Sequence, residues 1–385
     1  MSTDRSPSGS PRARALGIPF DGIPGPDNAI TDVPGVEVGY VTLIAGDGDL
    51  DVGRGPVRTG VTAILPRGRA GIGSSVPSGW YSLNGNGEMT GTTWLSETGG
   101  LSSPVMITNT HAVGTVHRGV VDWVVNNRPD LAMQWLLPVV AETWDGYLND
   151  INGDHVRVEH AGSAIDQAHA GAIEEGSVGG GTGMNCYGFK GGSGTSSRTV
   201  DHLGHPFTVG AFVQANFGDR KELRIAGAYL GDVDVPNPLD DETWWQRDLA
   251  RSAPTGAGSV IVIVATDAPL LPAQCTALAR RVPLGLARTG TTGGHFSGDI
   301  FLAFSTPQAG VLDSRFPSGD DEPFELMRFV PWGHMDALFA ATVQAVEEAV
   351  VNALVVNADM VGRDGNWTPA LPHDAIRDRL AAGST

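Results

Sequence analysis

Cysteine and charged residues are both scarce in this sequence of 385 residues. The two cysteines, Cys186 and Cys275, form no Cys-x-x-Cys pair, so they provide neither a disulfide framework nor a redox motif of that kind. Charged residues make up 18% of the chain, and the formal net charge is −18. A surface this acidic repels phosphate groups, which argues against nucleic-acid binding through a basic face.

Signals of several other protein classes are also missing. Residues 1–14 contain no apolar segment of the secretory type, and no uninterrupted stretch approaches the ~18 apolar residues of a membrane span. There is no G-x-S-x-G elbow, no glycine loop followed by Gly-Lys-Ser/Thr, and no H-E-x-x-H or Cys/His cluster. We therefore expect a soluble, cytoplasmic protein with no metal, no organic cofactor, and no nucleic-acid or membrane partner.

Glycine, in contrast, is abundant: 53 residues, nearly double the usual share of about 7%. The glycines are densest in residues 176–194. Because glycine allows positive φ and close backbone approach, we expect the backbone of this segment to line a site. Residues 1–16 are rich in Ser, Pro and Arg, and this composition predicts a disordered tail.

Hydrophobic periodicity predicts short strands and a few helices between Gly and Pro residues. Strands are predicted at 36–42, 61–65, 105–108, 137–142, 207–216, 223–230, 259–266 and 299–304. Helices are predicted at 116–127, 163–175, 272–282 and 335–357. The elements alternate in blocks rather than in strict β-α-β units, which favours a layered α/β sandwich over a doubly wound parallel sheet.

The most informative feature is the junction between Gly258 and Ser259. Residues 231–258 are polar, acidic and interrupted by proline, the composition of an exposed, cleavable loop. Ser259 then begins a β-branched run that is typical of a strand buried on both faces. Cleavage at the junction would free the α-amino group of Ser259, and an α-amino group with a pKa of about 7.7–8.0 can deprotonate the neighbouring hydroxyl. The junction is also compatible with a serine that merely begins a strand.

Six longer segments add to this hypothesis. They are residues 84–91, 183–191, 195–198, 213–218, 265–270 and 297–306, with sequences such as Asn-Gly-Asn-Gly-Glu-Met-Thr-Gly for the first and Gln-Ala-Asn-Phe-Gly within the fourth. Together they resemble the family of L-aminopeptidase D-amidase/D-esterases and β-peptidyl aminopeptidases. The resemblance runs from about residue 14 to the end of the predicted helix 335–357.

The resemblance implies an α/β protein of α+β type, a four-layer α/β/β/α sandwich of the N-terminal-nucleophile kind. Family members are made as inactive precursors that cut themselves before a serine, and the matching bond here is Gly258–Ser259. A cut there would divide a single catalytic domain into residues 17–258, which end in the linker 231–258, and residues 259–385. The family also forms homo-oligomers of the cleaved pair, so we expect the same here.

The resemblance further implies a role for each of several side chains. Ser259 would cut its own chain and attack substrate, with Ser297 and Asp299 beside it. Asn216 would help to form the oxyanion hole. Glu142 would bind the free ammonium group of the substrate, and Trp144 would form a wall of its pocket. Family members carry Glu where Asp299 stands, so this carboxylate is shorter by about one C–C bond (~1.5 Å).

Plainer interpretations of the same residues stay open at this point. Asn216 could satisfy backbone groups, and Ser297 with Asp299 could be a turn residue and its cap. Glu142 and Asp145 could be exposed loop carboxylates, while Trp144 could belong to the core.

The expected function is release of N-terminal residues from small peptides, amides or esters that have a free amino group. Whether α-peptides, β-peptides or D-amino acid amides and esters are the substrates stays open. One alternative is a self-cleaving acyltransferase of ornithine-acetyltransferase-like fold, but the pattern of those enzymes has threonine where Ser259 stands. The other alternative is an unprocessed, non-catalytic binding protein.

Overall fold

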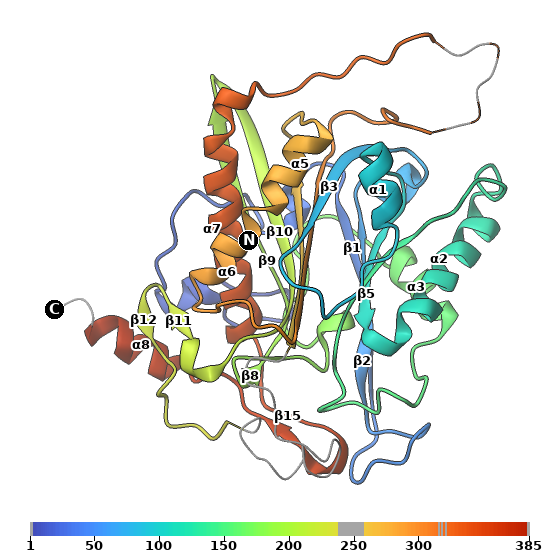
Figure 1. Ribbon diagram of the computed structural model, residues 1–385. Helices are drawn as coiled ribbons and strands as arrows, with labels where there is room; N and C mark the ends of the chain where they lie inside the picture. The colour runs from blue at the N-terminus through green and yellow to red at the C-terminus, as the bar shows by residue number, and fades with distance from the viewer. Residues whose placement is uncertain (1–2, 238–257, 315, 317–318, 320–321, 383–385) are drawn as a thin grey trace.

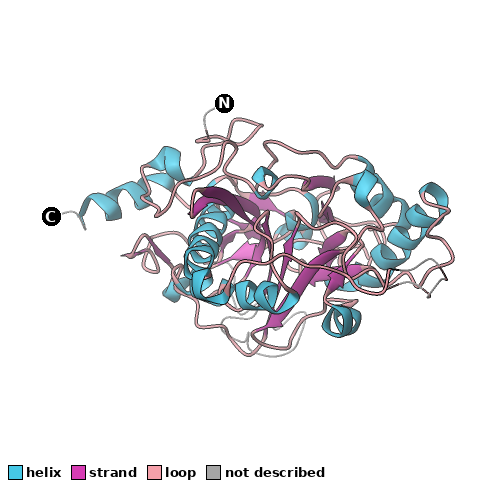
Figure 2. Ribbon diagram, turned by 90° about the horizontal axis from the view of Figure 1, so that it is seen from above, coloured by secondary structure: helices cyan, strands magenta, loops and turns pink. Residues whose placement is uncertain are grey.

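The computed structural model describes residues 3–237, 258–314, 316, 319 and 322–382, which form four layers (Figures 1 and 2). Two β-sheets lie face to face, and helices cover the outer face of each sheet. The predicted four-layer sandwich is confirmed.

Among the described residues, the larger sheet has six strands in the order β4-β3-β14-β13-β10-β9, and the smaller has four in the order β1-β2-β5-β6. The larger sheet consists of β3 (Val76–Ser82), β4 (Gly100–Leu101), β9 (Gly192–His202), β10 (His205–Asn216), β13 (Gly258–Thr266) and β14 (Ser297–Ser305). The smaller sheet consists of β1 (Glu37–Ala45), β2 (Val57–Leu65), β5 (Val105–Asn109) and β6 (Val139–Thr143). Neighbouring strands are antiparallel except for two parallel pairs, β13 with β14 and β5 with β6.

The helices fall into two groups. Those over the larger sheet are α5 (Pro272–Ala279), α6 (Val282–Ala287) and α7 (Asp336–Val355), and those over the smaller sheet are α2 (Val113–Asn127) and α3 (Val158–Asp166). The other α-helices in the described part of the chain are α1 (Thr92–Thr98) and α8 (His373–Ala382). Short strands pair there as β7 (Asn185–Cys186) with β8 (Phe189–Lys190), β11 (Arg224–Ile225) with β12 (Ala228–Tyr229), and β15 (Met360–Val361) with β16 (Trp367–Thr368). Short 3-10 helices lie in the connecting segments.

Strand β13 contributes to two of the hydrophobic cores that separate the layers. Val260 and Val262 pack in the core beneath α7, whereas Ile261 and Ile263 pack in the core between the two sheets. A strand buried on both faces needs apolar residues at consecutive positions rather than at alternate ones. This is why the uninterrupted run at 259–266 predicted the strand correctly.

Helix α7 is long and apolar enough to cross a membrane by length and composition, with a mean hydropathy of 1.4. In the fold it is a core helix: 78% of its most apolar window is buried, and it packs against β9 and β10. The approach to β9 is close because Gly194 has no side chain; a Cβ there would lie 2.1 Å from the carbonyl oxygen of Ala349. Burial in the core explains the apolar composition of this helix.

Most predicted elements are present, but some bounds were wrong. The helix predicted at 163–175 is α3, which ends at Asp166; beyond it His169 pairs with Val38 and Gly171 adopts a φ of 85°. The strand predicted at 223–230 is the β11–β12 hairpin, which turns at Ala226 and Gly227 with φ of 48° and 79°. The helix predicted at 272–282 is divided into α5 and α6. The predicted linker, 231–258, falls mostly on residues 238–257, which lie outside the described part of the chain.

Residues 3–16 are packed against the fold, which corrects the prediction of a disordered tail. Arg12 forms a buried ion pair with Glu175 at 2.6 Å, and Ala13 and Leu16 belong to the core beneath α7. The composition of residues 1–16 could not reveal this packing, because the carboxylates that pair with Arg12 and Arg14 are Glu175 and Glu348, which are distant in the sequence.

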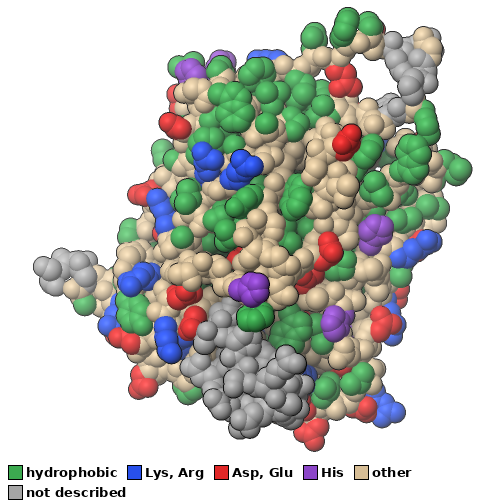
Figure 3. Space-filling view, in the orientation of Figure 1, with side chains coloured by type: hydrophobic (Ala, Val, Ile, Leu, Met, Phe, Trp, Pro, Cys, Tyr) green, Lys and Arg blue, Asp and Glu red, His purple; other side chains and the backbone are tan. Residues whose placement is uncertain are grey.

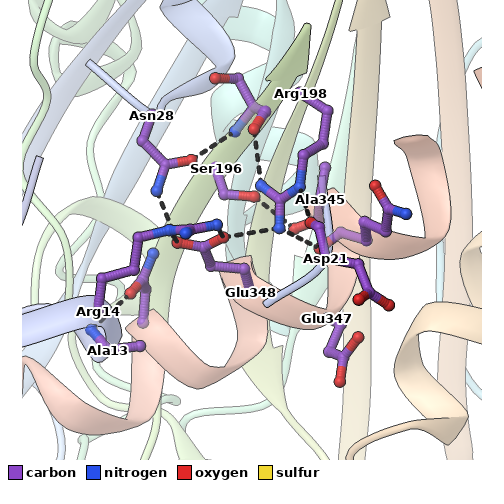
Figure 4. A network of polar contacts seen from close by, with 12 residues as sticks. Ala13, Arg14, Asp21, Asn28, Ser196, Arg198, Ala345, Glu347 and Glu348 are labelled. Atoms are coloured by element: carbon purple, nitrogen blue, oxygen red, sulfur yellow. Dashed lines mark hydrogen bonds and ion pairs between the residues drawn. The ribbon is translucent and has the colours of Figure 1, made fainter. Parts of the chain in front are cut away.

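Figure 4 shows the polar network that fastens this segment to α7. The carboxylate of Glu348 accepts hydrogen bonds from Arg14 at 2.7 Å, from Asn28 at 2.6 Å and from Arg198 of β9 at 2.7 Å. The Glu348 side chain is fully buried and that of Arg198 is 1% exposed. Burial alone would raise the pKa of Glu348, but Arg14 and Arg198 hold this pKa below its ordinary value. The network joins the N-terminal segment, the larger sheet and the last long helix.

Candidate active site

Ser259 lies near the start of β13, in the middle of the larger sheet. It is directly opposite Asn216 on antiparallel β10 and beside Gly298 on parallel β14. The strand begins one residue earlier than predicted, at Gly258. The Gly258–Ser259 bond therefore lies within the sheet's ladder, and Ser259 is only 2% exposed.

The hydroxyl group of Ser259 is buried without a hydrogen-bond partner among the described residues. Side chains alternate along a strand, so Ser259 shares the face of Ile261 and Ile263, toward the smaller sheet. Most buried hydroxyl groups are hydrogen-bonded, and a catalytic role is one explanation for an exception. The Ser259 Oγ is thus buried between the sheets with its proton uncommitted.

Asn216 is fixed at both ends of its side-chain amide. Its Oδ1 accepts a hydrogen bond from the backbone N–H of Asn185 at 2.9 Å, and its Nδ2 donates to the carbonyl of Trp144 at 3.0 Å. The plainer interpretation, an asparagine that satisfies backbone groups, is therefore correct. This interpretation accounts for only part of the side chain. The amide nitrogen of Asn216 carries two N–H bonds, and the carbonyl of Trp144 accepts one of them.

Ser297 and Asp299 flank the predicted scissile bond on β14. In the ladder Ser297 is beside Gly258, and Asp299 is beside Val260. Ser297 Oγ donates to Asp299 Oδ1 at 2.5 Å, so the shorter carboxylate does reach this serine. The two side chains alternate with Gly298 and so leave β14 on the face opposite that of Ser259. Ser297 is therefore not hydrogen-bonded to the Ser259 hydroxyl in the uncut chain.

The Asp299 carboxylate has a second neighbour that the sequence did not single out. Asn84 donates from Nδ2 to Asp299 Oδ2 at 2.8 Å and accepts the backbone N–H of Asp299 at 2.7 Å. Burial raises the pKa of Asp299, and the hydrogen bonds from Ser297 and Asn84 oppose that shift. Asn84 lies in the 84–91 motif, so the resemblance had indicated the segment without giving this residue a role.

Glu142 lies near the end of β6 and is 3% exposed, which corrects its interpretation as an exposed loop carboxylate. Its Oε1 accepts from the backbone N–H of Glu88 at 3.0 Å, and its Oε2 accepts from the hydroxyl of Thr110. Burial raises the pKa of Glu142, while these hydrogen bonds lower it. Gly87 lies between Glu142 and β14, the strand beside that of Ser259: a Cβ there would lie 2.8 Å from Gly298 Cα and 3.3 Å from Glu142 Oε1.

Trp144 and Asp145 follow Glu142 and have opposite environments. Trp144 is 36% exposed and its ring covers Gly146, where a Cβ would lie 2.4 Å from the indole. It is therefore not a core residue. Asp145 is completely buried, and burial raises its pKa to about 7 although Thr59 and Asn149 donate hydrogen bonds to it. This buried position is also a correction for Asp145.

The structure thus brings Ser259, Asn216, Ser297 and Asp299 together at one end of the larger sheet, with Glu142 across the sheet interface. Among the described residues, no three His, Cys, Asp or Glu side chains come together in the manner of a metal site. Besides Asn84, two other contributors escaped the sequence reasoning, Asn185 and Thr110. Asn185 lies in the 183–191 motif, but no sequence signal pointed to Thr110.

Comparison with known proteins agrees with this geometry. The family model of peptidase family S58 matches residues 28–368. The beta-peptidyl aminopeptidase BapA of Sphingosinicella microcystinivorans is 50% identical over 370 residues, which cover 95% of this chain and 91% of that protein. The solved L-aminopeptidase D-Ala-esterase/amidase of Ochrobactrum anthropi is 44% identical with a TM-score of 0.87, over 97% of this chain and 99% of that one. A beta-aminopeptidase of Burkholderia sp. is 45% identical with a TM-score of 0.85, over 96% and 98%.

The Ochrobactrum structure is described as a prototype of the serine aminopeptidases and as a variant of the N-terminal-nucleophile hydrolase fold. The four layers, the central serine strand and the extent of these matches define a hydrolase that acts on peptide bonds, of the aminopeptidase or amidase type. The chain belongs to peptidase family S58.

Proposed function

We propose that this protein is a self-cleaving serine aminopeptidase and amidase in which Ser259 both cuts its own chain and attacks substrate. The observation that carries the proposal is the buried Ser259 hydroxyl, which has no hydrogen-bond partner among the described residues and lies opposite Asn216 at the predicted scissile bond.

In the cleavage step, Ser259 Oγ attacks the carbonyl carbon of Gly258. The C–N bond then breaks, the hydroxyl proton passes to the departing nitrogen, and Gly258 is left as an ester on Ser259. Water hydrolyses that ester, which leaves a carboxylate on Gly258 and a free α-amino group on Ser259. The ladder on both sides of β13 keeps the new N-terminus in place.

In turnover, the α-amino group of Ser259 accepts the hydroxyl proton while Oγ attacks the substrate carbonyl. The second N–H of Asn216 Nδ2 donates to the developing oxyanion, an interaction worth about 2.7–4 kcal/mol in comparable sites. Ser297, oriented by Asp299, lies beside the new terminus in the ladder and keeps the α-amino group of Ser259 aligned, and that group passes the proton on to the leaving amine. Water then releases the acyl group from Ser259.

The proposed substrates are small peptides, amides or esters with a free amino group. Glu142 supports this class, because it is a buried carboxylate close to β14, the strand beside that of Ser259, and a substrate ammonium would supply its missing counter-charge. Half-exposed Trp144 would form the outer wall of that pocket. Two relatives are named for β-peptide substrates, so a β-amino acid at the N-terminus is included in the proposed class.

We also propose a homo-oligomer of cleaved pairs. Hydrophobic side chains are exposed over the end of α2, at the upper right of Figure 3. They include Met133, Trp135 and Phe316, which are 96%, 74% and 76% exposed, and the last two rings lie 4.9 Å apart. Light scattering should give more than one chain pair per particle, and Trp135→Ser should lower that number; a monomeric parent protein would refute the proposal.

The decisive experiment is an intact-mass measurement of the purified protein together with N-terminal sequencing. Two polypeptides, residues 1–258 and 259–385, are expected to elute as one particle. A homogeneous, active chain of 385 residues would refute the mechanism, because Ser259 would then have no free amine.

A further inference from the structure

Lysine occurs only twice in the chain, and the two side chains have opposite surroundings. Lys221 is exposed, whereas Lys190, at the end of β8, is completely buried. Among the described side chains, no carboxylate pairs with Lys190. Its ammonium group donates instead to two backbone carbonyls, those of Met184 at 3.0 Å and Gly191 at 2.8 Å. Burial lowers the pKa of Lys190 to about 7, which means that the interior disfavours the charged form of this side chain.

The two carbonyls lie at the open end of the β7–β8 hairpin. Met184 directly precedes β7 and Gly191 directly follows β8, while the closed end turns at Tyr187 and Gly188 with φ of 53° and 68°. The backbone N–H of Gly191 also donates to the carbonyl of Met184, at 2.9 Å. The ammonium of Lys190 therefore bridges the two chain segments where they enter and leave the hairpin.

Asn185 comes directly after Met184 and connects this bridge to the candidate active site. Its backbone N–H donates to Asn216 Oδ1, and Asn216 is opposite Ser259 in the ladder. This hydrogen bond also fixes the orientation of the Asn216 side-chain amide, because a backbone N–H can bond only to the amide oxygen and not to the amide nitrogen. With Oδ1 held by Asn185 and Nδ2 held by Trp144, the amide cannot rotate and present its oxygen to an oxyanion.

We propose that Lys190 is a positioning residue for catalysis: its ammonium ties the ends of the β7–β8 hairpin together and so holds the Asn185 N–H against Asn216 Oδ1. The inference rests on the proposed role of Asn216 in the oxyanion hole. Lys190 touches neither Ser259 nor the substrate, and its effect passes through the orientation of one amide.

Lys190→Met tests the proposal because methionine keeps the length and apolar stem of the side chain and removes the donors. A misplacement of about 1 Å far from the chemistry can cost 10²-fold in rate, so we expect kcat to fall by about 10- to 100-fold. KM should change less than about two-fold, since the amide acts on the developing oxyanion. Lys221→Met, at the exposed lysine, is the matched control and should behave as the parent enzyme. An unchanged kcat for Lys190→Met would overturn the proposal.

Combining the variant with Asn216→Ala shows whether Lys190 acts through that residue. Asn216→Ala alone should lower kcat by about 10²–10³. If Lys190 acts through Asn216, adding Lys190→Met should cause little further loss, whereas multiplied losses would show an independent effect and refute the proposal. A normal kcat for Asn216→Ala would instead refute the oxyanion role, so failure of the proposed function is distinguishable from failure of this inference.

A second measurement keeps the proposal testable if Lys190→Met does not fold. Lysine labelled with ¹³C at Cε gives one NMR signal for Lys190 and one for Lys221. Asn216→Ala releases the Asn185 N–H, so it should shift the signal of Lys190 and leave that of Lys221 unchanged. A Lys190 signal that is insensitive to this substitution would show that the hairpin and the amide are not coupled, and would overturn the proposal.

Discussion

Glu348→Gln should destabilise the protein severely, although the substitution lies in α7 and away from Ser259. The carboxylate accepts hydrogen bonds from Arg14, Asn28 and Arg198, and the glutamine that replaces it cannot balance two guanidinium groups. Arg198 is only 1% exposed, so water cannot compensate for the lost charge.

The expected loss follows from this burial. Removing one partner of a buried ion pair costs about 3–5 kcal/mol, a large part of the roughly 5–15 kcal/mol by which domains are stable. Glu347→Gln is the matched control on the neighbouring residue. Glu347 pairs at 2.8 Å with Arg288, which is 42% exposed, and exposed pairs contribute about 0–1 kcal/mol.

Urea unfolding of both variants should be measured in the Ser259→Ala background, where the chain stays in one piece. The pH dependence gives a second check. Because Arg14 and Arg198 depress the pKa of Glu348 below the ordinary 4.5, its contribution is present above that pH and is lost as the pH falls through the depressed value. Equal unfolding free energies for Glu348→Gln and Glu347→Gln would refute the reasoning.

Three further predictions concern the site. Ser259→Ala should give a folded, uncut chain without amidase activity; mass spectrometry and circular dichroism would show this, and loss of only one of the two reactions would contradict a shared nucleophile. Glu142→Gln should lower kcat/KM for free-amine substrates by about 10- to 100-fold, the worth of a charge-assisted hydrogen bond, while neutral esters are hardly affected. Equal effects on both substrates would remove Glu142 from ammonium binding. For Asp145, burial raises the pKa from 3.8 to about 7, so the native state binds this proton more tightly than the unfolded state and loses stability as the pH rises through that window. Asp145→Asn should abolish this decline in pH-dependent unfolding, and an unchanged decline would assign it to other groups.

The sequence predicted those parts of the fold that depend on local pattern. The run at 260–265 is apolar at every position because β13 is buried on both faces, and α2 kept the helical spacing of its valines. The run at 223–230 was misleading, since Ala226 and Gly227 adopt positive φ and reverse the chain within it. Strand-like composition alone does not reveal such a turn.

The candidate site likewise has features that the sequence indicated and features that it could not indicate. The resemblance singled out Ser259, Asn216, Ser297 and Asp299, which lie close together in the structure, but only the register of the ladder shows that Asn216 is opposite Ser259. The directions of the side chains were not predictable. Ser297 and Asp299 bond to each other on the face opposite the nucleophile's hydroxyl, because Gly298 rather than either of them is the residue beside Ser259.

Burial of charge was the property that composition predicted least well. Arg12, Arg14 and Lys190 lie in segments that read as a flexible tail or a glycine loop, yet all three are held by carboxylates or carbonyls. Two of these partners, Glu175 and Glu348, are more than 160 positions away. Ion pairs between residues so far apart in the sequence cannot be recognised from the composition of a short segment.

The position of β13 and β14 also constrains how the protein can be synthesised. Apart from Gly258, both strands follow the proposed cleavage point in sequence, yet they lie between β3 and β10, which precede it. While the chain emerges from the ribosome, the first 258 residues contain two unpaired strand edges separated by a gap two strands wide, and such edges are prone to aggregate. Only translation of the last third of the message supplies the missing strands. The proposed self-cleavage would therefore come after completion of the sheet, and two separately translated halves should assemble poorly compared with the single polypeptide.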